Sequence, residues 1–294
     1  MADTTPGPLS GGGTLETFSA GDSHIQTSAA HLPGDKPGAV CSPVPPACPA
    51  VTVSEHEGVL YLHLGTEWIQ GAMRLRKPDA IEIQYVQQMM MWMLFNQQPR
   101  HIVQLGLGAA ALTKFCYRQF PAARVTAIEL NPAVIAICRS TFRLPPNDAR
   151  LEVIQTDALE FVMDPANHGA ADVLQIDLYD AAARGPVLDS PEFYQACADC
   201  LTADGMITVN LFGDFLNYGK NLQAMEAVFD AVAWLPEVHD ANVVVIGFKR
   251  APEIEFSILH QRAAAIRRTT NLPAKSWVNG LKAWMIEQSE DVST

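Results

Sequence analysis

The sequence has little positive charge. Lys and Arg total 20 against 32 Asp and Glu, so the formal net charge of the 294-residue chain is −12. A protein that binds nucleic acid needs a basic surface to neutralise the phosphates, so nucleic acid is not expected as a partner. The acidic field instead favours a small cationic ligand.

Long apolar runs are also missing. The longest, Met89–Phe95, has seven residues, whereas a membrane-spanning helix needs about 18 or more. The first Lys is Lys36, so no basic stretch precedes an apolar one near Met1, and a secretory signal is not expected. We therefore expect a cytoplasmic protein with no membrane partner.

Cysteines are few and scattered. A chain of this size gains little from disulfides, and reduced thiols fit the cytoplasm. Cys197 and Cys200 have CxxC spacing, but no second Cys pair or His pair accompanies them. Core packing is therefore preferred over a metal or redox role, and no metal is expected.

The first part of the chain divides into three segments. Residues 1–50 are rich in Gly, Pro and Ser and predict a flexible N-terminal tail. Alternating runs then predict a small antiparallel β unit within residues 51–78. The runs are Val51–Ser54, Val59–Leu64 and Glu67–Leu75. Asp79 begins a predicted helix, whose Met-rich face is more typical of a core than of a cofactor site.

From Arg100 onward, predicted strands and helices alternate, which predicts a parallel sheet. The strands are Ile102–Leu105, Val125–Glu129, Leu151–Gln155, Asp172–Ile176, Met206–Asn210, Ala233–Val238 and Val243–Phe248. The last two are joined by a short turn, which implies one antiparallel strand. The pattern resembles the seven-stranded, Rossmann-like α/β sheet of class I S-adenosylmethionine-dependent methyltransferases. We expect this catalytic domain over residues 79–250 and C-terminal helices over 251–294.

A glycine loop follows the first of these strands. Gly106 and Gly108 permit a tight turn and close approach of a ligand to the backbone, ahead of a helix N-terminus. A GxG alone is weak, but Glu129 follows Gly108 by about the 20 positions expected for an acid that binds ribose hydroxyls. The alternative for Glu129 is a solvent-facing side chain at a strand end.

Two features favour an adenosyl sulfonium over a nicotinamide dinucleotide. Glu129 begins a Glu-x-Asn-Pro string, and the next strand ends in Asp157 and Ala158. A carboxylate at Asp157 can accept from an adenine amino group. It also suits the N-cap of the following helix, and both roles are compatible.

A pair of aspartates follows the fourth strand of the sheet. Ligands of doubly wound sheets bind outside the carboxyl ends of the strands, so Asp177 and Asp180 are expected to face the glycine loop. One carboxylate can hold an ammonium while the other accepts a proton from the attacking amine. Turn and cap chemistry is the alternative, and no nearby His completes a metal site.

At these residues the chain resembles the spermidine synthase (polyamine aminopropyltransferase) family, and more closely its divergent bacterial spermidine synthase-like branch. The similarity spans roughly Val51 to Lys249. The strings that carry it are QLGLGAAAL from Gln104, VTAIELNP from Val125, TDALEF from Thr156 and DVLQIDLYD from Asp172.

The resemblance implies transfer of an aminopropyl group from decarboxylated S-adenosylmethionine to a polyamine such as putrescine, in a homodimer or homotetramer. It makes Glu129 the ribose ligand and Asp157 the adenine-side acid. Asp177 becomes the base and Asp180 an amine holder. Tyr85, Gln70 and Tyr179 are then assigned to the amine side of the site.

The chain departs from the family in its glycine loop, where GGGDGG gives way to a loop with Ala109 at the Asp position. The family's Asp helps hold the aminopropyl ammonium. Its loss costs on the order of 1–3 kcal/mol of donor binding. Two alternatives therefore remain, a methyltransferase that uses S-adenosylmethionine on the same scaffold and a non-catalytic adenosyl-binding homologue.

Overall fold

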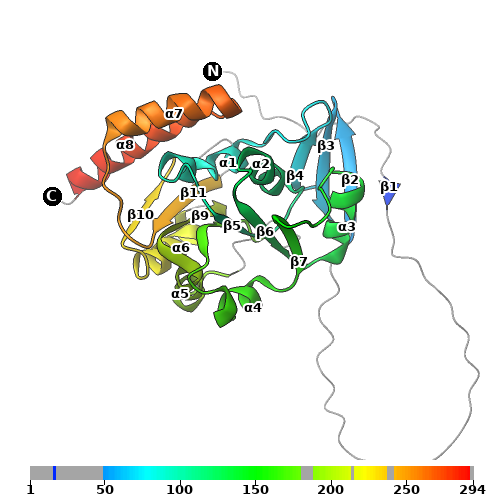
Figure 1. The fold of residues 1–294 in the computed structure, drawn as a ribbon, viewed down its shortest axis with the longest axis horizontal. Helices are drawn as coiled ribbons and strands as arrows, with labels where there is room; N and C mark the ends of the chain where they lie inside the picture. Colours follow the sequence, from blue (N-terminus) through cyan, green and yellow to red (C-terminus); the bar gives the residue numbers. More distant parts are fainter. Residues whose placement is uncertain (1–15, 18–48, 180–187, 213–214, 237–241, 292–294) are drawn as a thin grey trace, which may run out of the picture.

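The structure is a computed structural model that describes residues 16–17, 49–179, 188–212, 215–236 and 242–291. Nearly all of the predicted tail over residues 1–50 lies outside this range, and so does Asp180. Figure 1 shows a central sheet with helices on both faces and a small second sheet beside it.

The small sheet contains the three predicted N-terminal strands, β2 (Val51–His56), β3 (Val59–Leu64) and β4 (Ile69–Arg74). A two-residue strand, β1 (Glu16–Thr17), pairs with β2, and the antiparallel order is β1-β2-β3-β4. Alternation places Leu60 and Leu62 of β3 in the core, as expected for a strand with one buried face.

The main sheet has seven strands in the order β10-β11-β9-β8-β5-β6-β7. They are β5 (His101–Leu105), β6 (Arg124–Glu129), β7 (Leu151–Gln155), β8 (Ala171–Ile176), β9 (Leu201–Phe212), β10 (Ala231–Trp234) and β11 (Asn242–Phe248). Among the described strands of this sheet, β11 runs antiparallel to both of its neighbours, β9 and β10, and the other pairs are parallel. The sheet is therefore of the predicted type, and the carboxyl ends of β5 to β9 share one edge.

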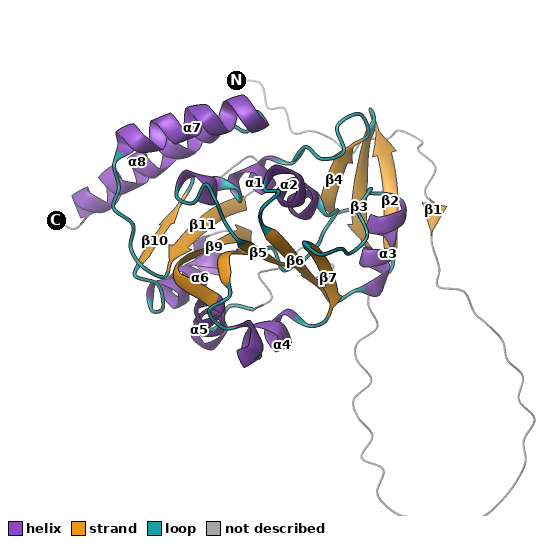
Figure 2. Ribbon diagram, viewed as in Figure 1, coloured by secondary structure: helices purple, strands orange, loops and turns teal. Residues whose placement is uncertain are grey.

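Helices cover both faces of this sheet (Figure 2). One face packs against α4 (Ala158–Met163), α5 (Pro191–Cys200) and α6 (Phe215–Glu226). The opposite face packs against α2 (Ala111–Gln119), α3 (Pro132–Ser140) and the C-terminal pair α7 (Phe256–Thr270) and α8 (Ala274–Asp291). Side-chain caps start several helices, with Asn131, Asp157 and Ser190 accepting backbone N–H bonds.

The predicted long helix from Asp79 is wrong in its extent. The chain forms a short α1 (Gln84–Gln88) and then a 3₁₀ turn, η1 (Met91–Leu94). The carbonyl of Met89 accepts from the buried side chains of Gln175 and Thr208, while the N–H of Met93 turns to Met90. A contact with the sheet thus replaces the helical bond, although the Met-rich segment is buried as expected.

The CxxC pair lies in the core. Cys197 and Cys200 are free and buried, and Cys200 donates to the carbonyl of Val162. Burial raises the pKa of the Cys200 thiol to about 11 and that of Cys197 well above its ordinary value. Neither thiol is primed to react. In the described part of the chain, no helix is both long and apolar enough to cross a bilayer.

Candidate active site

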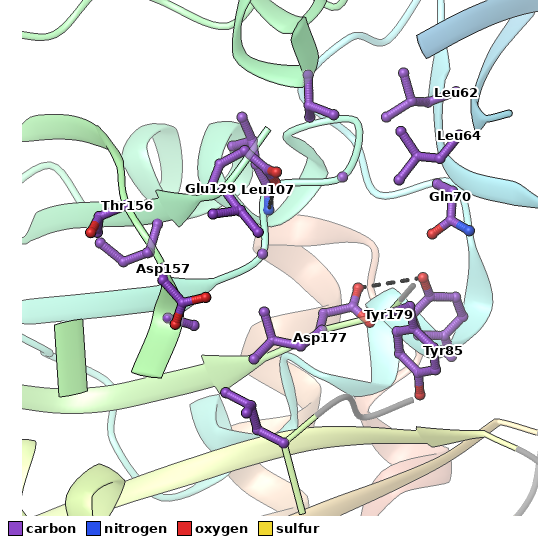
Figure 3. A pocket seen from close by; sticks show the side chains of 18 residues that line it. Leu62, Leu64, Gln70, Tyr85, Leu107, Glu129, Thr156, Asp157, Asp177 and Tyr179 are labelled. Atoms are coloured by element: carbon purple, nitrogen blue, oxygen red, sulfur yellow. Dashed lines mark hydrogen bonds between the residues drawn. The ribbon is translucent and has the colours of Figure 1, made fainter. Parts of the chain in front are cut away.

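A cavity of about 210 Å³ lies at the carboxyl edge of the main sheet, under the small N-terminal sheet. Figure 3 shows its walls, with Thr156 and Asp157 on one side, Glu129 in the middle, and Gln70, Tyr85 and Tyr179 on the other side. Every described residue that the sequence assigns to the site lines this cavity. They are Gln70, Tyr85, Gly106, Gly108, Glu129, Asp157, Ala158, Asp177 and Tyr179.

The glycine loop is held between two other backbone segments. Gly106 has φ +92°, and a Cβ there would lie 2.3 Å from the carbonyl oxygen of Asp177. Gly108 has φ +49°, and its Cβ would lie 2.9 Å from the carbonyl oxygen of Gln70. On the Cβ side of both glycines, the group that comes close to the loop is thus the backbone of the protein itself. It brings the loop, β4 and the end of β8 together.

Glu129, at the end of β6, has both carboxylate oxygens anchored. Oε2 accepts from the N–H of Leu107 at 3.1 Å, and Oε1 accepts from the N–H of Asn131 at 2.8 Å. Burial raises its pKa, and these backbone bonds oppose the shift. Glu129 lines the cavity and keeps acceptor capacity for a further donor.

Asp157 is the N-cap of α4. Its Oδ1 accepts from the N–H of Leu159 at 2.7 Å and of Glu160 at 3.4 Å. The capping role weighed from the sequence is therefore present. Both bonds end on Oδ1, so the cap does not use Oδ2, and Asp157 lines the cavity beside the buried Ala158.

Asp177, just past β8, is held by two side chains from distant parts of the chain. Tyr85 of α1 donates to Oδ2 at 3.4 Å, and the amide of Asn210 on β9 donates to Oδ1 at 3.0 Å. Burial raises the pKa of Asp177, while these two bonds lower it in part. Burial beside the Asp177 charge also raises the pKa of Tyr85 well above its ordinary value. Asp177 is thus an oriented carboxylate with enhanced basicity.

Asn210 is a residue of this cluster that the sequence did not identify as a site residue. Its backbone carbonyl accepts from the hydroxyl of Tyr179 at 2.7 Å, and burial raises the pKa of Tyr179. The side-chain Oδ1 of Asn210 is buried and has no hydrogen-bond partner in the described structure. A buried acceptor without a donor is rare, and this one belongs to the side chain that bonds Asp177.

A second, larger cavity of about 490 Å³ adjoins the first and shares Gln70, Tyr85 and Tyr179 with it. Its other walls include the rings of Tyr61, Trp68 and Phe212. Sequence analysis missed Trp68 and Phe212. Trp68 immediately precedes β4, and Phe212 ends a strand predicted to stop at Asn210, so neither belongs to a recognisable motif.

Ala109, where the resemblance expects an acid, faces the small sheet. A Cβ on Gly71 of β4 would lie 2.6 Å from the Ala109 Cβ, and Ala109 is 2% exposed. A hollow of about 20 Å³ remains beside it, room for about one water. Asp177 is the only carboxylate among the described residues that line this hollow.

The described residues contain no group of three or more His, Cys, Asp or Glu side chains arranged to hold a metal ion.

A nucleoside-type cavity at the strand tips of a methyltransferase-like sheet, with an oriented aspartate beside it, defines an adenosyl-dependent transferase scaffold. The family model described as "Spermine/spermidine synthase domain" matches residues 82–233. The polyamine aminopropyltransferase of Chromobacterium violaceum is 30% identical over 242 residues, covering 82% of this chain and 92% of the relative. The chain belongs to the spermine/spermidine synthase family.

Two further comparisons place the fold. A probable spermidine synthase from Corynebacterium glutamicum superimposes with a TM-score of 0.64 at 18% identity, over 79% of this chain and 91% of that one. The human eEF1A lysine and N-terminal methyltransferase is 23% identical over 63% of this chain and 28% of its own length. The scaffold is thus shared with methyltransferases, whereas the longer match is to aminopropyltransferases.

Proposed function

We propose that the protein is a polyamine aminopropyltransferase that transfers the aminopropyl group of decarboxylated S-adenosylmethionine to an amine such as putrescine. The observation that carries the proposal is the position of Asp177. It lies where the smaller cavity, lined by Glu129 and Asp157, approaches the larger cavity through Tyr85 and Tyr179. The family membership supports the same chemistry.

The smaller cavity holds the adenosyl donor. Glu129 accepts from the ribose hydroxyls and Asp157 Oδ2 accepts from the adenine amino group. The sulfonium is already a good leaving group, so the enzyme's main tasks are alignment and proton removal. No metal takes part in this scheme.

The larger cavity holds the acceptor. An ammonium has no lone pair, so the attacking nitrogen first gives up a proton to Asp177, whose raised pKa suits it to accept one. The nitrogen then attacks the carbon next to sulfur. A C–N bond forms, the C–S bond breaks with its electron pair going to sulfur, and methylthioadenosine leaves. Tyr85 and Asn210 orient the carboxylate.

Asp180 is kept in the proposal as an amine holder, although it lies outside the described residues. We also propose that residues 51–78 form the N-terminal β unit and residues 79–250 the catalytic domain, with 251–294 as C-terminal helices. A homodimer or homotetramer in the cytoplasm completes the proposal.

The methyltransferase alternative rests on one observation, the absence of a loop acid at Ala109. S-adenosylmethionine carries its own carboxylate, which an acid at that position would repel and Ala109 does not. The relative lengths of the two matches favour aminopropyl transfer.

The test is an assay of purified protein with decarboxylated S-adenosylmethionine and putrescine. We expect methylthioadenosine to form and to fall to background in Asp177→Ala. Calorimetric titration with both donors separates the alternative, because tighter binding of the carboxylated donor favours a methyltransferase. If no methylthioadenosine forms above the Asp177→Ala control, aminopropyl transfer to putrescine is wrong.

A further inference from the structure

The larger cavity has more space than a small diamine needs. Putrescine has six non-hydrogen atoms, which at about 30 Å³ each, the share of a water molecule, occupy about 180 Å³. The cavity measures about 490 Å³. A four-carbon diamine therefore leaves more than half of the cavity empty, and a longer or substituted acceptor fills it better.

Five of the eleven described residues that line this cavity are aromatic. The ring centroids of Trp68 and Phe212 lie 6.3 Å apart at 72°, and those of Phe212 and Tyr179 lie 6.4 Å apart at 81°. Three rings thus form a continuous edge-to-face row that ends beside the Asp177 cluster. Such faces attract ammonium groups through their quadrupoles.

Trp68 lines the larger cavity and is exposed to solvent. The residue is 56% exposed, yet its backbone is held, because His63 bonds its carbonyl and Thr66 accepts from its N–H. Ser54 in turn bonds the other nitrogen of His63 at 2.8 Å. A large indole fixed at a cavity mouth and left in contact with water is a ready ligand surface.

Acidic groups are scarce in the same wall. Among the described residues that line the cavity, Glu67 is the only carboxylate, and it is exposed. Exposed carboxylates add little to the binding of a cation, because water screens the charge. The described wall therefore has one weak acidic site and several aromatic faces for a distal cation.

We propose that this cavity recognises the distal end of the acceptor through aromatic ring faces, so that the acceptor class includes amines whose distal ammonium carries alkyl groups. N-alkylated diamines belong to this class. A ring face needs charge but no N–H donor, so alkylation preserves the contact, whereas it removes donors that a carboxylate pair requires. The proposal rests on the proposed function, since it specifies the acceptor of that reaction.

The first experiment compares three acceptors at saturating donor, putrescine, N,N-dimethyl-1,4-diaminobutane and n-pentylamine. The last has the same number of non-hydrogen atoms as putrescine but no distal charge. We expect kcat/KM for the dimethyl amine to be within about threefold of putrescine or higher. The value for n-pentylamine should fall about 5- to 30-fold, the size of one cation–π contact. A loss of more than tenfold on dimethylation would overturn the proposal.

The second experiment uses a matched pair of exposed neighbours, Trp68→Leu and Glu67→Gln. Trp68→Leu should raise KM for putrescine and the dimethyl amine about 5- to 30-fold with little change in kcat or donor affinity. Glu67→Gln should change KM less than threefold. Phe212→Leu provides a second test in the same row of rings. A larger effect of Glu67→Gln than of Trp68→Leu contradicts aromatic recognition.

Binding measurements separate this proposal from the proposed function. If no acceptor yields methylthioadenosine, the aminopropyl transfer fails. Calorimetry of the three amines with the wild type and Trp68→Leu still tests the cavity, and we expect the same order of affinities. If none of the amines binds, or if n-pentylamine and the dimethyl amine bind with equal affinity, the inference is wrong.

Discussion

The two halves of the site are built in different ways. The proposed donor half consists of strand ends and the turns that follow them. Glu129 is anchored by backbone N–H groups of the glycine loop and of the following turn, and Asp157 by the first turn of its own helix. The acceptor half is assembled from the small sheet, α1 and the far end of β9. If the proposed function holds, donor binding depends mainly on the turns at the strand ends, whereas acceptor choice depends on how distant segments pack.

The largest expected effect is at the junction of the two halves. Asp177→Asn should lower kcat by about 10²- to 10⁴-fold, the usual contribution of a general base, in the methylthioadenosine assay. Donor affinity should change less than kcat, because Glu129 and Asp157 are the carboxylates that we assign to the adenosine.

The same substitution should raise Tm at neutral pH. Burial raises the pKa of Asp177 above its unfolded value, so its stabilising contribution is complete below about pH 4 and is lost as pH rises through the folded pKa. The side-chain amide of Asn210 can flip, because its Oδ1 has no partner to lose. In Asp177→Asn this oxygen can then accept a hydrogen bond from the amide introduced at position 177.

Asp172, at the opposite end of β8, is the matched control. It accepts from the N–H groups of Arg100 and His101 at 2.6 and 3.1 Å and from the hydroxyl of Thr202. Asp172→Asn weakens these charge-assisted bonds and should lower stability by about 1–2 kcal/mol while leaving kcat within about twofold. A fall of Tm in Asp177→Asn, or a large loss of kcat in Asp172→Asn, would contradict the distinction.

The next largest effect tests the donor half. Glu129→Gln turns one of two anchored oxygens into an amide that faces a backbone N–H, so donor Kd should rise about tenfold or more. Asp157→Asn keeps a good cap, so its donor Kd should rise less. Calorimetry with donor alone measures both. KM for the amine should stay constant in each variant, and a selective change in amine KM would place these residues in the wrong half.

The pH profile sharpens the comparison further. Because burial raises the pKa of Asp177, the acid limb of kcat/KM should have its midpoint above the ordinary carboxyl value of about 3.9. Activity should fall as pH drops through it. Tyr85→Phe removes one bond that lowers this pKa, so the limb should move to higher pH. If the midpoint of the acid limb is the same in Tyr85→Phe as in the wild type, the group that titrates in this limb is not Asp177.

The smallest effect concerns the glycine loop. Ala110 is buried with φ +58°, a left-handed conformation that costs about 1–2 kcal/mol for a residue with a side chain. Ala110→Gly relieves this cost, loses a buried methyl worth about 0.8 kcal/mol and frees the unfolded chain. The net change in unfolding free energy should lie within about 1 kcal/mol of zero.

Ala109→Gly is its neighbour control. Ala109 is also buried but does not have a positive φ. Glycine at this position therefore loses a buried methyl group and gives the unfolded chain more conformational freedom, and it relieves no strain. Denaturant unfolding should find it less stable than Ala110→Gly by about 1–2 kcal/mol. Equal values would mean that Ala110 is not strained.

The sequence predicted the sheet well, and it also identified strand ends that line the smaller cavity, because both depend on short-range patterns. Glu129 follows the glycine loop at a fixed interval, and Asp157 sits where one strand meets one helix. It failed at the helix from Asp79, because the Met89 carbonyl is taken by Gln175 and Thr208 from the sheet. Asn210 and Trp68 were missed for a related reason. Their roles arise from contacts with residues far away in sequence, which no local spacing indicates.

The contact between Gly71 and Ala109 limits the exchange of the small N-terminal sheet among relatives. The two backbones meet with no room for a second side chain, so a transplanted β hairpin must bring its own glycine at that point. A transplanted hairpin with a larger residue at this position would displace the glycine loop. The exchange would then change the choice of acceptor but weaken binding of the co-substrate.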